Sequence, residues 1–191
     1  IKERLGERGL ESYLVFTRGS RPRLESLRQG RNHLTVVSAL AAEALGPPDL
    51  ETLLVLSPGT FVREHRVYFV EGRTSDGRRR RVAADPSSFD FQRLTQLEFA
   101  DQDVELVPLN YLVAIREMLA GTVDEVILDV DDALMRFPPS IGSRPLAQDV
   151  REHLGAANTR AAFVGRADDA VVRVIARECL EGRRLEAIQR D

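Results

Sequence analysis

The stretch RVAADPSSFDFQRLTQLEF, which runs from Arg81 to Phe99, changes character halfway along its length. An apolar run typical of a buried strand stops at Asp85, and a proline and two serines follow. Phe91, Leu94 and Leu97 then recur at helical spacing. The pattern predicts a strand followed at once by a helix, and ligands of open α/β sheets bind beside such strand ends. The junction is therefore a candidate wall of a binding site.

The rest of the chain repeats this alternation of strands and helices, which predicts an α/β fold with short buried strands. Strands are expected at residues 11–19, 33–39, 50–56, 61–72, 78–85, 103–110, 124–130 and 159–166. Residues 137–147 are expected to form a loop or a return strand. Helices are expected at residues 1–10, 21–30, 38–45, 88–100, 111–123 and 168–188.

Composition excludes several classes of function. With 43% hydrophobic and 30% charged residues, the 191-residue chain has enough material for a globular core. Its apolar runs are far shorter than the roughly 20 residues that a bilayer requires, so we expect no membrane partner. A formal charge of −3 gives no positive field to attract DNA. The single cysteine, Cys179, suits a reducing compartment, and we predict a cytoplasmic protein.

No motif of nucleotide binding, acyl transfer or zinc hydrolysis occurs in the sequence, and the three histidines are scattered. We therefore predict no catalytic residues, no cofactor and no metal. The acidic run at residues 129–132 resembles a cation site only in composition, because no EF-hand loop surrounds it. Asp129 is interpreted instead as a hydrogen-bonding residue at a strand end.

Four consecutive arginines, Arg78 to Arg81, precede the junction. Neighbouring residues of a strand point to opposite faces, so these side chains are not expected to form one nucleic-acid surface. We predict that they are solvated or paired with acidic residues at a strand edge.

From residue 35 onward the sequence resembles the C-terminal effector domain of the YhfZ family of bacterial transcription regulators. The resemblance rests on the order and spacing of five segments along one chain. These are VVSALAAE (36–43), LSPGTFVREH (56–65), RVAADPSSFD (81–90), VELVPLNY (104–111) and GTVDEVILDV (121–130).

This resemblance implies a two-lobed type II periplasmic-binding-protein-like fold, in which two α/β lobes hold a ligand. Residues 1–191 then form one ligand-sensing effector domain. Lobe I is expected at about 1–57 and 145–191, and lobe II at about 82–130. Crossing strands are expected within 53–70 and at 80–85 or 104–109. A winged helix and the first strand of lobe I are expected before residue 1, so DNA is bound only through that upstream domain.

The resemblance also implies a small-molecule effector and a homodimer that reads two DNA half-sites. The helix start after Asp85 favours negative charge, so the effector is expected to be anionic or zwitterionic. The serines at the junction, with free N–H groups of the helix start, are expected to bind an anionic group. The alternative is that Ser87 only caps the helix. Asp129 stands where relatives are expected to carry an amide, which favours a ligand with a donor or positive group. The predicted ligand-binding residues are Ser38, Thr60, Phe61, Asp85, Ser87, Ser88, Asn110 and Asp129.

Two other functions are compatible with these observations. One is a solute-binding protein of a transporter. The other is a small-molecule enzyme on the same fold, with Asp85 or Asp129 as the base and His65 as the acid. The sequence before residue 1 is expected to separate a regulator from a transporter component.

Overall fold

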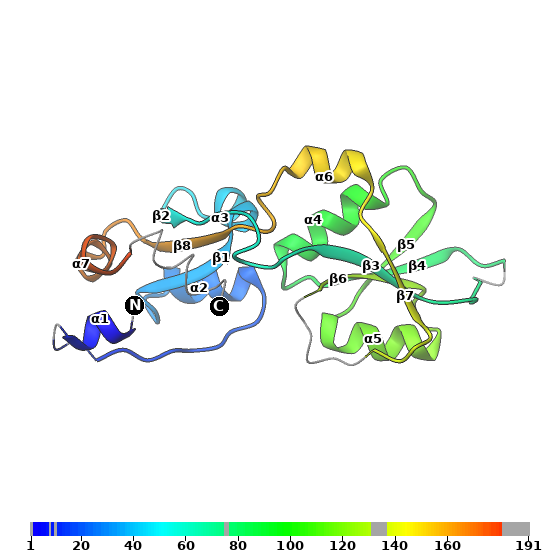
Figure 1. The fold of residues 1–191 in the computed structure, drawn as a ribbon, viewed down its shortest axis with the longest axis horizontal. Coiled ribbons are helices and arrows are strands. Elements are labelled where there is room, and N and C mark those ends of the chain that lie inside the picture. The colour runs from blue at the N-terminus through cyan, green and yellow to red at the C-terminus, as the bar shows by residue number, and fades with distance from the viewer. Residues whose placement is uncertain (1, 8, 10, 75–76, 131–136, 181–191) are drawn as a thin grey trace. The chain divides into compact units, whose positions relative to one another are not determined.

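A computed structural model of the chain describes residues 2–7, 9, 11–74, 77–130 and 137–180. They fall into two compact units, one of residues 1–61 with 157–191 and the other of residues 62–156 (Figure 1). Helices alternate with strands in both, which confirms the predicted α/β class. Within the described part of the chain, no helix has the length and apolarity that crossing a membrane requires.

The first unit contains a three-stranded antiparallel sheet in the order β1-β8-β2. Its strands are β1 (Leu34–Ser38), β2 (Leu50–Val55) and β8 (Ala161–Arg166). The central strand β8 pairs with both outer strands and is buried over five consecutive residues. The helices of this unit are α1 (Lys2–Glu7), α2 (Ser20–Arg28), α3 (Ala39–Leu45) and α7 (Ala170–Cys179).

The second unit contains a five-stranded mixed sheet in the order β5-β4-β6-β3-β7. Strand β4 runs parallel to both β5 and β6, whereas β3 runs antiparallel to β6 and β7. The strands are β3 (His65–Val70), β4 (Arg80–Ala84), β5 (Val104–Pro108), β6 (Glu125–Asp129) and β7 (Ile141–Pro145). The helices are α4 (Phe89–Glu98), α5 (Tyr111–Ala120) and α6 (Gln148–Leu154).

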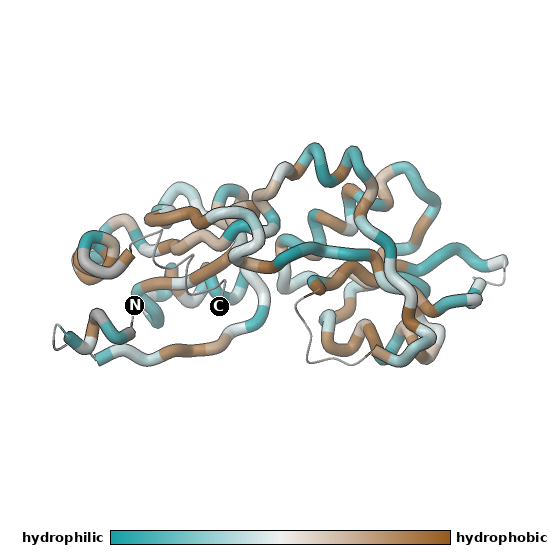
Figure 2. The backbone as a smooth tube through the Cα atoms, viewed as in Figure 1, coloured by the Kyte–Doolittle hydropathy of each residue, from teal (hydrophilic) through white to brown (hydrophobic). Residues whose placement is uncertain are grey.

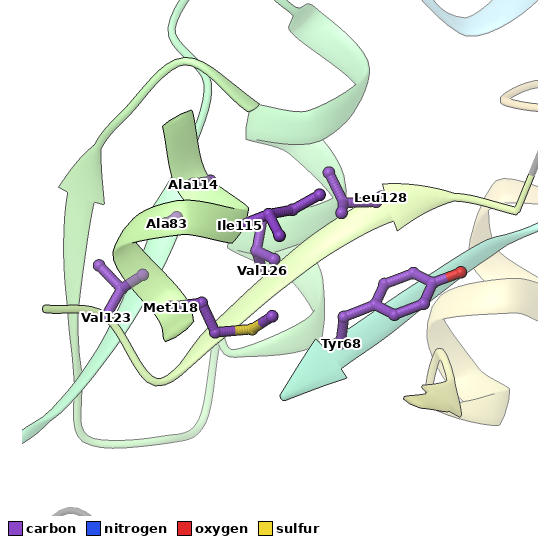
Figure 3. Close-up of a cluster of buried hydrophobic side chains, with 8 residues drawn as sticks. All are labelled: Tyr68, Ala83, Ala114, Ile115, Met118, Val123, Val126 and Leu128. Carbon is purple, nitrogen blue, oxygen red and sulfur yellow. The ribbon is translucent and has the colours of Figure 1, made fainter. Parts of the chain in front are cut away.

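Helices α4 and α5 cover opposite faces of the second sheet (Figure 1). Helix α5 places Ala114, Ile115 and Met118 against the sheet, and all three are buried. The close-up in Figure 3 shows them beside side chains of β3, β4 and β6, namely Tyr68, Ala83, Val126 and Leu128, with Val123 at the end of the helix. Because strand side chains alternate between faces, Val82 and Ile127 point to the opposite face, toward α4.

The strands predicted to cross between lobes at residues 80–85 or 104–109 do not cross. They are β4 and β5, and they lie inside the sheet of the second unit. The chain passes from one unit to the other at residues 61–62, which lie within the crossing predicted for 53–70, and again at residues 156–157. The second unit also extends beyond the range 82–130 expected for lobe II, because β3 and β7 pair along the same sheet as β6.

The predicted strand at residues 11–19 is absent. Residues 11–18 form neither helix nor strand, although their apolar run has strand composition. Figure 2 shows this run as a hydrophobic stretch of the backbone between α1 and α2. A strand exists only when a neighbour accepts and donates its backbone hydrogen bonds, so composition alone did not decide this segment.

The arginine run is confirmed as an ion-paired segment. Each of the four guanidinium groups lies within salt-bridge distance of a carboxylate in β5 or β6 or directly before one of them, at 2.7 to 3.5 Å. The pairs are Arg78–Asp124, Arg79–Asp103, Arg80–Glu125 and Arg81–Glu105. The expectation of a sheet edge was wrong, because β4 lies between β5 and β6. The pairing leaves this run without the surplus positive charge that a phosphate backbone requires.

Candidate functional site

The carboxyl ends of three parallel strands, β5, β4 and β6, meet at one edge of the second sheet. The chain leaves β4 into α4 and leaves the adjacent β5 into α5, and these helices lie on opposite faces (Figure 1). Neighbouring strands whose connections diverge in this way form a topological switch point, where open α/β sheets place their ligands. We call this place the carboxyl edge of the second unit.

Asp85 occupies the carboxyl edge directly after β4, and it is only 4% exposed. One carboxylate oxygen, Oδ1, accepts hydrogen bonds from the backbone N–H of Ser87 at 2.8 Å and from its hydroxyl at 2.7 Å. The other, Oδ2, accepts from the backbone N–H of Tyr111, the first residue of α5, at 3.1 Å. One side chain thus ties the turn before α4 to the start of α5, and we call these three bonds the Asp85 bridge.

The two helices that start at the carboxyl edge each have a polar cap. The Ser88 hydroxyl accepts from the backbone N–H of Phe91 at 3.4 Å, and the Asn110 side-chain oxygen accepts from that of Leu112 at 3.0 Å. The N-cap of α4 is therefore Ser88, whereas the sequence alternative placed the cap at Ser87. Ser87 instead turns back onto Asp85, as an Asx turn does.

The sequence predicted free backbone N–H groups at this junction, but four of these groups have acceptors within the protein. The backbone N–H groups of Ser87, Phe91, Tyr111 and Leu112 all donate to side-chain oxygens of the protein itself. A helix start attracts negative charge because its N–H groups are unsatisfied, and the Asp85 carboxylate already supplies that charge. Asp85 thus accepts from the start of α5 and from the turn before α4, and binding of a ligand anion at the start of α4 itself stays a prediction.

An aromatic cluster, which sequence reasoning did not find, adjoins the Asp85 bridge. Phe91 of α4 meets the ring of His65 edge-on at 5.8 Å and the ring of Tyr111 at 5.7 Å between centroids. His65 is 4% exposed and lies opposite Asp129 in the β3–β6 register. In the sequence, the one local indication that an aromatic residue lies at this edge is that Tyr111, like Asn110, follows the end of a predicted strand. The cluster links α4, α5 and β3 at the carboxyl edge.

Asp129 ends β6 at the same edge and is half-buried. It is thus near the level of Asp85, since β4 and β6 run in parallel register. The alternative metal interpretation of the acidic run also involved residues 131 and 132, which lie outside the described residues. Of the predicted site residues, the structure brings together five at this edge: Asp85, Ser87, Ser88, Asn110 and Asp129.

The other three predicted residues belong to the first unit and have structural contacts there. Ser38 is fully buried, and its hydroxyl accepts from the backbone N–H of Ala41 to cap α3. The Thr60 hydroxyl donates to the carbonyl of Ser57 at 2.7 Å and accepts from the backbone N–H of Ala161 at 3.0 Å. Phe61 packs in a cluster built on Leu56, Ala161 and Phe163. That these residues share one ligand with the carboxyl edge stays a prediction.

Comparison with known proteins identifies the family. The sequence profile of the YhfZ C-terminal domain matches residues 1–191, the whole of the sequence. The chain belongs to the YhfZ C-terminal domain family. It is 32% identical over 182 residues to the uncharacterized protein YhfZ of Escherichia coli strain K12. That match covers 95% of this chain and 59% of the relative, so the chain spans less than two thirds of the relative's length.

Solved structures show how this family domain folds. The crystal structure of YhfZ from Shigella flexneri matches 99% of the chain and 81% of that protein, with 31% identity and a TM-score of 0.74. An ancestral arginine-binding protein bound to arginine matches 100% of the chain and 80% of that protein, with 14% identity and a TM-score of 0.63. Full-length CbnR in complex with its target DNA matches 98% of the chain and 64% of that protein, with 10% identity and a TM-score of 0.56. The family domain therefore has the predicted type II periplasmic-binding-protein-like fold.

Proposed function

We propose that the chain is the small-molecule-sensing effector domain of a bacterial transcription regulator, and that it acts in the cytoplasm without catalysing a reaction. The observation that carries the proposal is that one fold covers nearly the whole chain both in an arginine-binding protein and in CbnR, which binds DNA. The E. coli relative is also longer than the matched domain, which leaves room for a DNA-binding part. The fold supports ligand binding, and the extra length supports a second activity.

A sensing domain transmits information only if its ligand binds one state of the protein more tightly than the other. In this proposal, DNA binds to a winged helix outside the present sequence, and a homodimer presents two such helices to two half-sites. Ligand binding changes the affinity for DNA, and DNA changes the affinity for the ligand by the same factor. An effect of about 5- to 150-fold is typical of such coupling.

The charged and polar side chains at the carboxyl edge of the second unit indicate which chemical class of ligand can bind there. Because Asp85 accepts from the first N–H group of α5 and from Ser87 before α4, a bare anion at this edge meets the negative charge of Asp85 and Asp129. The Asn110 side chain is exposed, and its amide NH₂ is a donor for a carboxylate group. Asp129 is an acceptor for an ammonium group. We therefore favour the zwitterionic class, such as an α-amino acid, over a simple acid.

A structural role accounts for Asp85 better than catalysis does. Both of its oxygens accept structural hydrogen bonds, so a proton taken by Asp85 disrupts the contacts that hold the starts of α4 and α5 together. The transporter alternative is supported by the same fold, which also occurs in the periplasmic aliphatic sulphonate-binding protein SsuA from Escherichia coli. A regulator and a transporter component differ in one measurable property: only the regulator, as a whole protein, binds specific DNA sequences.

DNA binding by the full-length protein tests the regulator proposal. Genomic fragments retained by the protein are sequenced, and their affinities are measured in the presence and absence of amino acids. We expect a small set of retained sites and a change in affinity of at least about 5-fold with one ligand. A protein that retains no specific fragment, yet binds an amino acid tightly, contradicts the regulator and favours the transporter component.

A pair of carboxylate variants tests the site itself. Asp129→Asn keeps the shape of the side chain and removes the charge proposed to bind an ammonium group. We expect titration calorimetry to show affinity for the amino acid lowered by about 10-fold or more, since a charge-assisted hydrogen bond contributes about 1.5–3 kcal/mol. Asp103→Asn is the matched control, because its side chain is 85% exposed before β5, at the opposite edge of the sheet. Equal affinities of the two variants contradict the assignment.

A further inference from the structure

Of the three histidines in the chain, all of which the structure describes, only His65 is buried. It begins β3 at the carboxyl edge of the second unit, and its ring meets Phe91 of α4 edge-on at 5.8 Å. Burial disfavours the charged form of an imidazole, whereas a carboxylate close by favours it. The charge of His65 therefore depends on which acids lie beside it and on whether they are engaged elsewhere.

The register of β3 and β6 places Asp129 directly opposite His65. The backbone N–H of Val130 donates to the carbonyl of Glu64 at 3.0 Å, so these two residues form the hydrogen-bonded pair next in the ladder. Hydrogen-bonded and non-hydrogen-bonded pairs alternate in an antiparallel ladder, so His65 and Asp129 form a non-hydrogen-bonded pair. The Cβ atoms of directly opposed residues lie about 4.5–5.5 Å apart on one face of the sheet. The Asp129 carboxylate is thus within reach of the imidazole.

Other elements bring further titratable and charged side chains near His65. They are Asp90 of α4, Tyr111 of α5, and Arg63, Glu64 and Arg66 of its own segment. Glu64 and Arg66 pair with each other at 3.2 Å. On the other side of β3, the register with β7 continues to the apolar residue Leu146. Asp129 is therefore the acid that strand pairing fixes directly opposite the imidazole.

We propose that His65 links the binding of the effector to pH. The inference rests on the proposed function, because it concerns the Asp129 carboxylate that is assigned there to the ammonium group of an amino acid. In the ligand-free protein, Asp129 pairs with the protonated imidazole of His65. The ammonium group takes that place on binding, and His65 releases its proton to the solvent, because two cations beside one carboxylate repel each other. The ammonium group keeps its own proton.

Release of a proton on binding gives the affinity a pH dependence of known sign. Where His65 is charged in the ligand-free protein, protons compete with the amino acid, and the affinity rises by up to about 10-fold per pH unit. Where His65 is already neutral, the affinity no longer changes with pH. Histidine changes its charge between about pH 5 and 8, so the dependence falls in a physiological range. The domain then responds to its effector more strongly as the pH rises.

Titration calorimetry of the 191-residue chain at two pH values tests the inference. The probe is the amino acid that gives the largest rise in melting temperature when the twenty are screened singly. We expect its Kd at about pH 5.5 to exceed that at about pH 7.5 by about 10-fold or more. At the lower pH, the heats of binding in two buffers of different ionisation enthalpy should differ by the amount that corresponds to release of about one proton. An equal Kd at both pH values, or an equal heat in both buffers, overturns the inference.

Two histidine variants separate the imidazole from other titrating groups. His65→Gln keeps a hydrogen-bonding side chain but carries no charge, so its Kd should change by less than about 2-fold between the two pH values. His153→Gln is the matched control, because His153 is exposed on α6, and it should keep the full pH dependence. If His65→Gln keeps that dependence too, another group titrates and the inference is wrong. If His65→Gln does not fold, the two-buffer measurement on the unaltered chain decides.

The outcomes also separate this inference from the proposed function. An amino acid that binds tightly with the same Kd at both pH values overturns the link to His65 and leaves the zwitterion site standing. If none of the twenty amino acids binds at either pH, the proposed site fails and this inference fails with it.

Discussion

Replacement of Asp85 by alanine should destabilise the second unit more than any other single substitution at the carboxyl edge. The side chain is 4% exposed, and three hydrogen bonds end on its carboxylate, at 2.7, 2.8 and 3.1 Å. Alanine leaves the backbone N–H groups of Ser87 and Tyr111 without their acceptor. An orphaned buried donor costs about 1–3 kcal/mol. Because both donors are only partly buried, we expect a loss toward the lower end of the doubled range, about 2–4 kcal/mol in the free energy of unfolding.

A more conservative variant separates the geometry from the charge. In Asp85→Asn the side-chain oxygen can still accept from Ser87, but its NH₂ group then faces the N–H of Tyr111, and two donors do not bond. We expect a loss of about 1–3 kcal/mol, corresponding to one orphaned donor.

The assay is urea unfolding followed by circular dichroism, with Asp103→Ala as the control. Asp103 pairs with Arg79 at 2.7 Å, but its side chain is 85% exposed, and such surface pairs contribute about 0–1 kcal/mol. If Asp85→Ala loses no more stability than Asp103→Ala, the Asp85 bridge does not hold the two helix starts together.

Three other substitutions are expected to affect stability through single contacts. Ser88→Ala removes the cap of α4 and should cost about 0.5–2 kcal/mol in urea unfolding, and no loss would place the cap elsewhere. The pKa of the Asp169 carboxyl is lowered in the folded state: burial raises it, but hydrogen bonds from the His33 ring and a backbone N–H outweigh that effect. The destabilisation by Asp169→Asn should therefore be complete at neutral pH and shrink as the pH falls below about 4, and a loss that is constant from pH 3 to 7 would contradict this assignment. Gly165→Ala places a methyl group against Val172 of α7 and should cost about 1–3 kcal/mol, whereas unchanged stability would show that α7 moves freely.

Local patterns were sufficient to predict elements that contain their own signals. The strand and helix on either side of Asp85 appear as β4 and α4, because the first is a short apolar run and the second has helical spacing with a serine before it. Helix α5 was likewise predicted from its apolar face, and Ile115 and Met118 are buried on it. These features depend only on residues close in sequence.

Features that depend on distant residues were not predicted correctly. Ser87 and Ser88 are equally good caps by local criteria, and the structure selects Ser88 because Asp85 engages Ser87 while also binding Tyr111, 26 residues later. The expected strand at residues 11–19 failed for a related reason, since a strand requires a neighbour. The positions of β4 and β5 within one sheet depend on pairing order, which residue composition does not encode.

In the candidate site, too, the features set by local sequence were predicted and the contacts between distant residues were not. Residues at strand ends were identified correctly as neighbours, because parallel strands bring their carboxyl ends to one edge. The contacts among these residues were not predicted. Asp85 accepts hydrogen bonds within the protein, and His65 meets Phe91 only because β3 pairs with β6. Of the anionic and zwitterionic ligands expected from the sequence, these contacts favour the zwitterion.

Thermal unfolding of the 191-residue chain in the presence of the twenty amino acids, each at up to 10 mM, tests the central claim of small-molecule sensing most directly. A ligand at about 100 times its Kd adds about 2.7 kcal/mol of stability. At about 2–4 °C per kcal/mol for a protein of this size, the melting temperature should rise by about 5–10 °C with one or a few of them, saturably, and less in Asp129→Asn. If no amino acid raises the melting temperature by more than about 1 °C, the proposed zwitterion site at the carboxyl edge is contradicted.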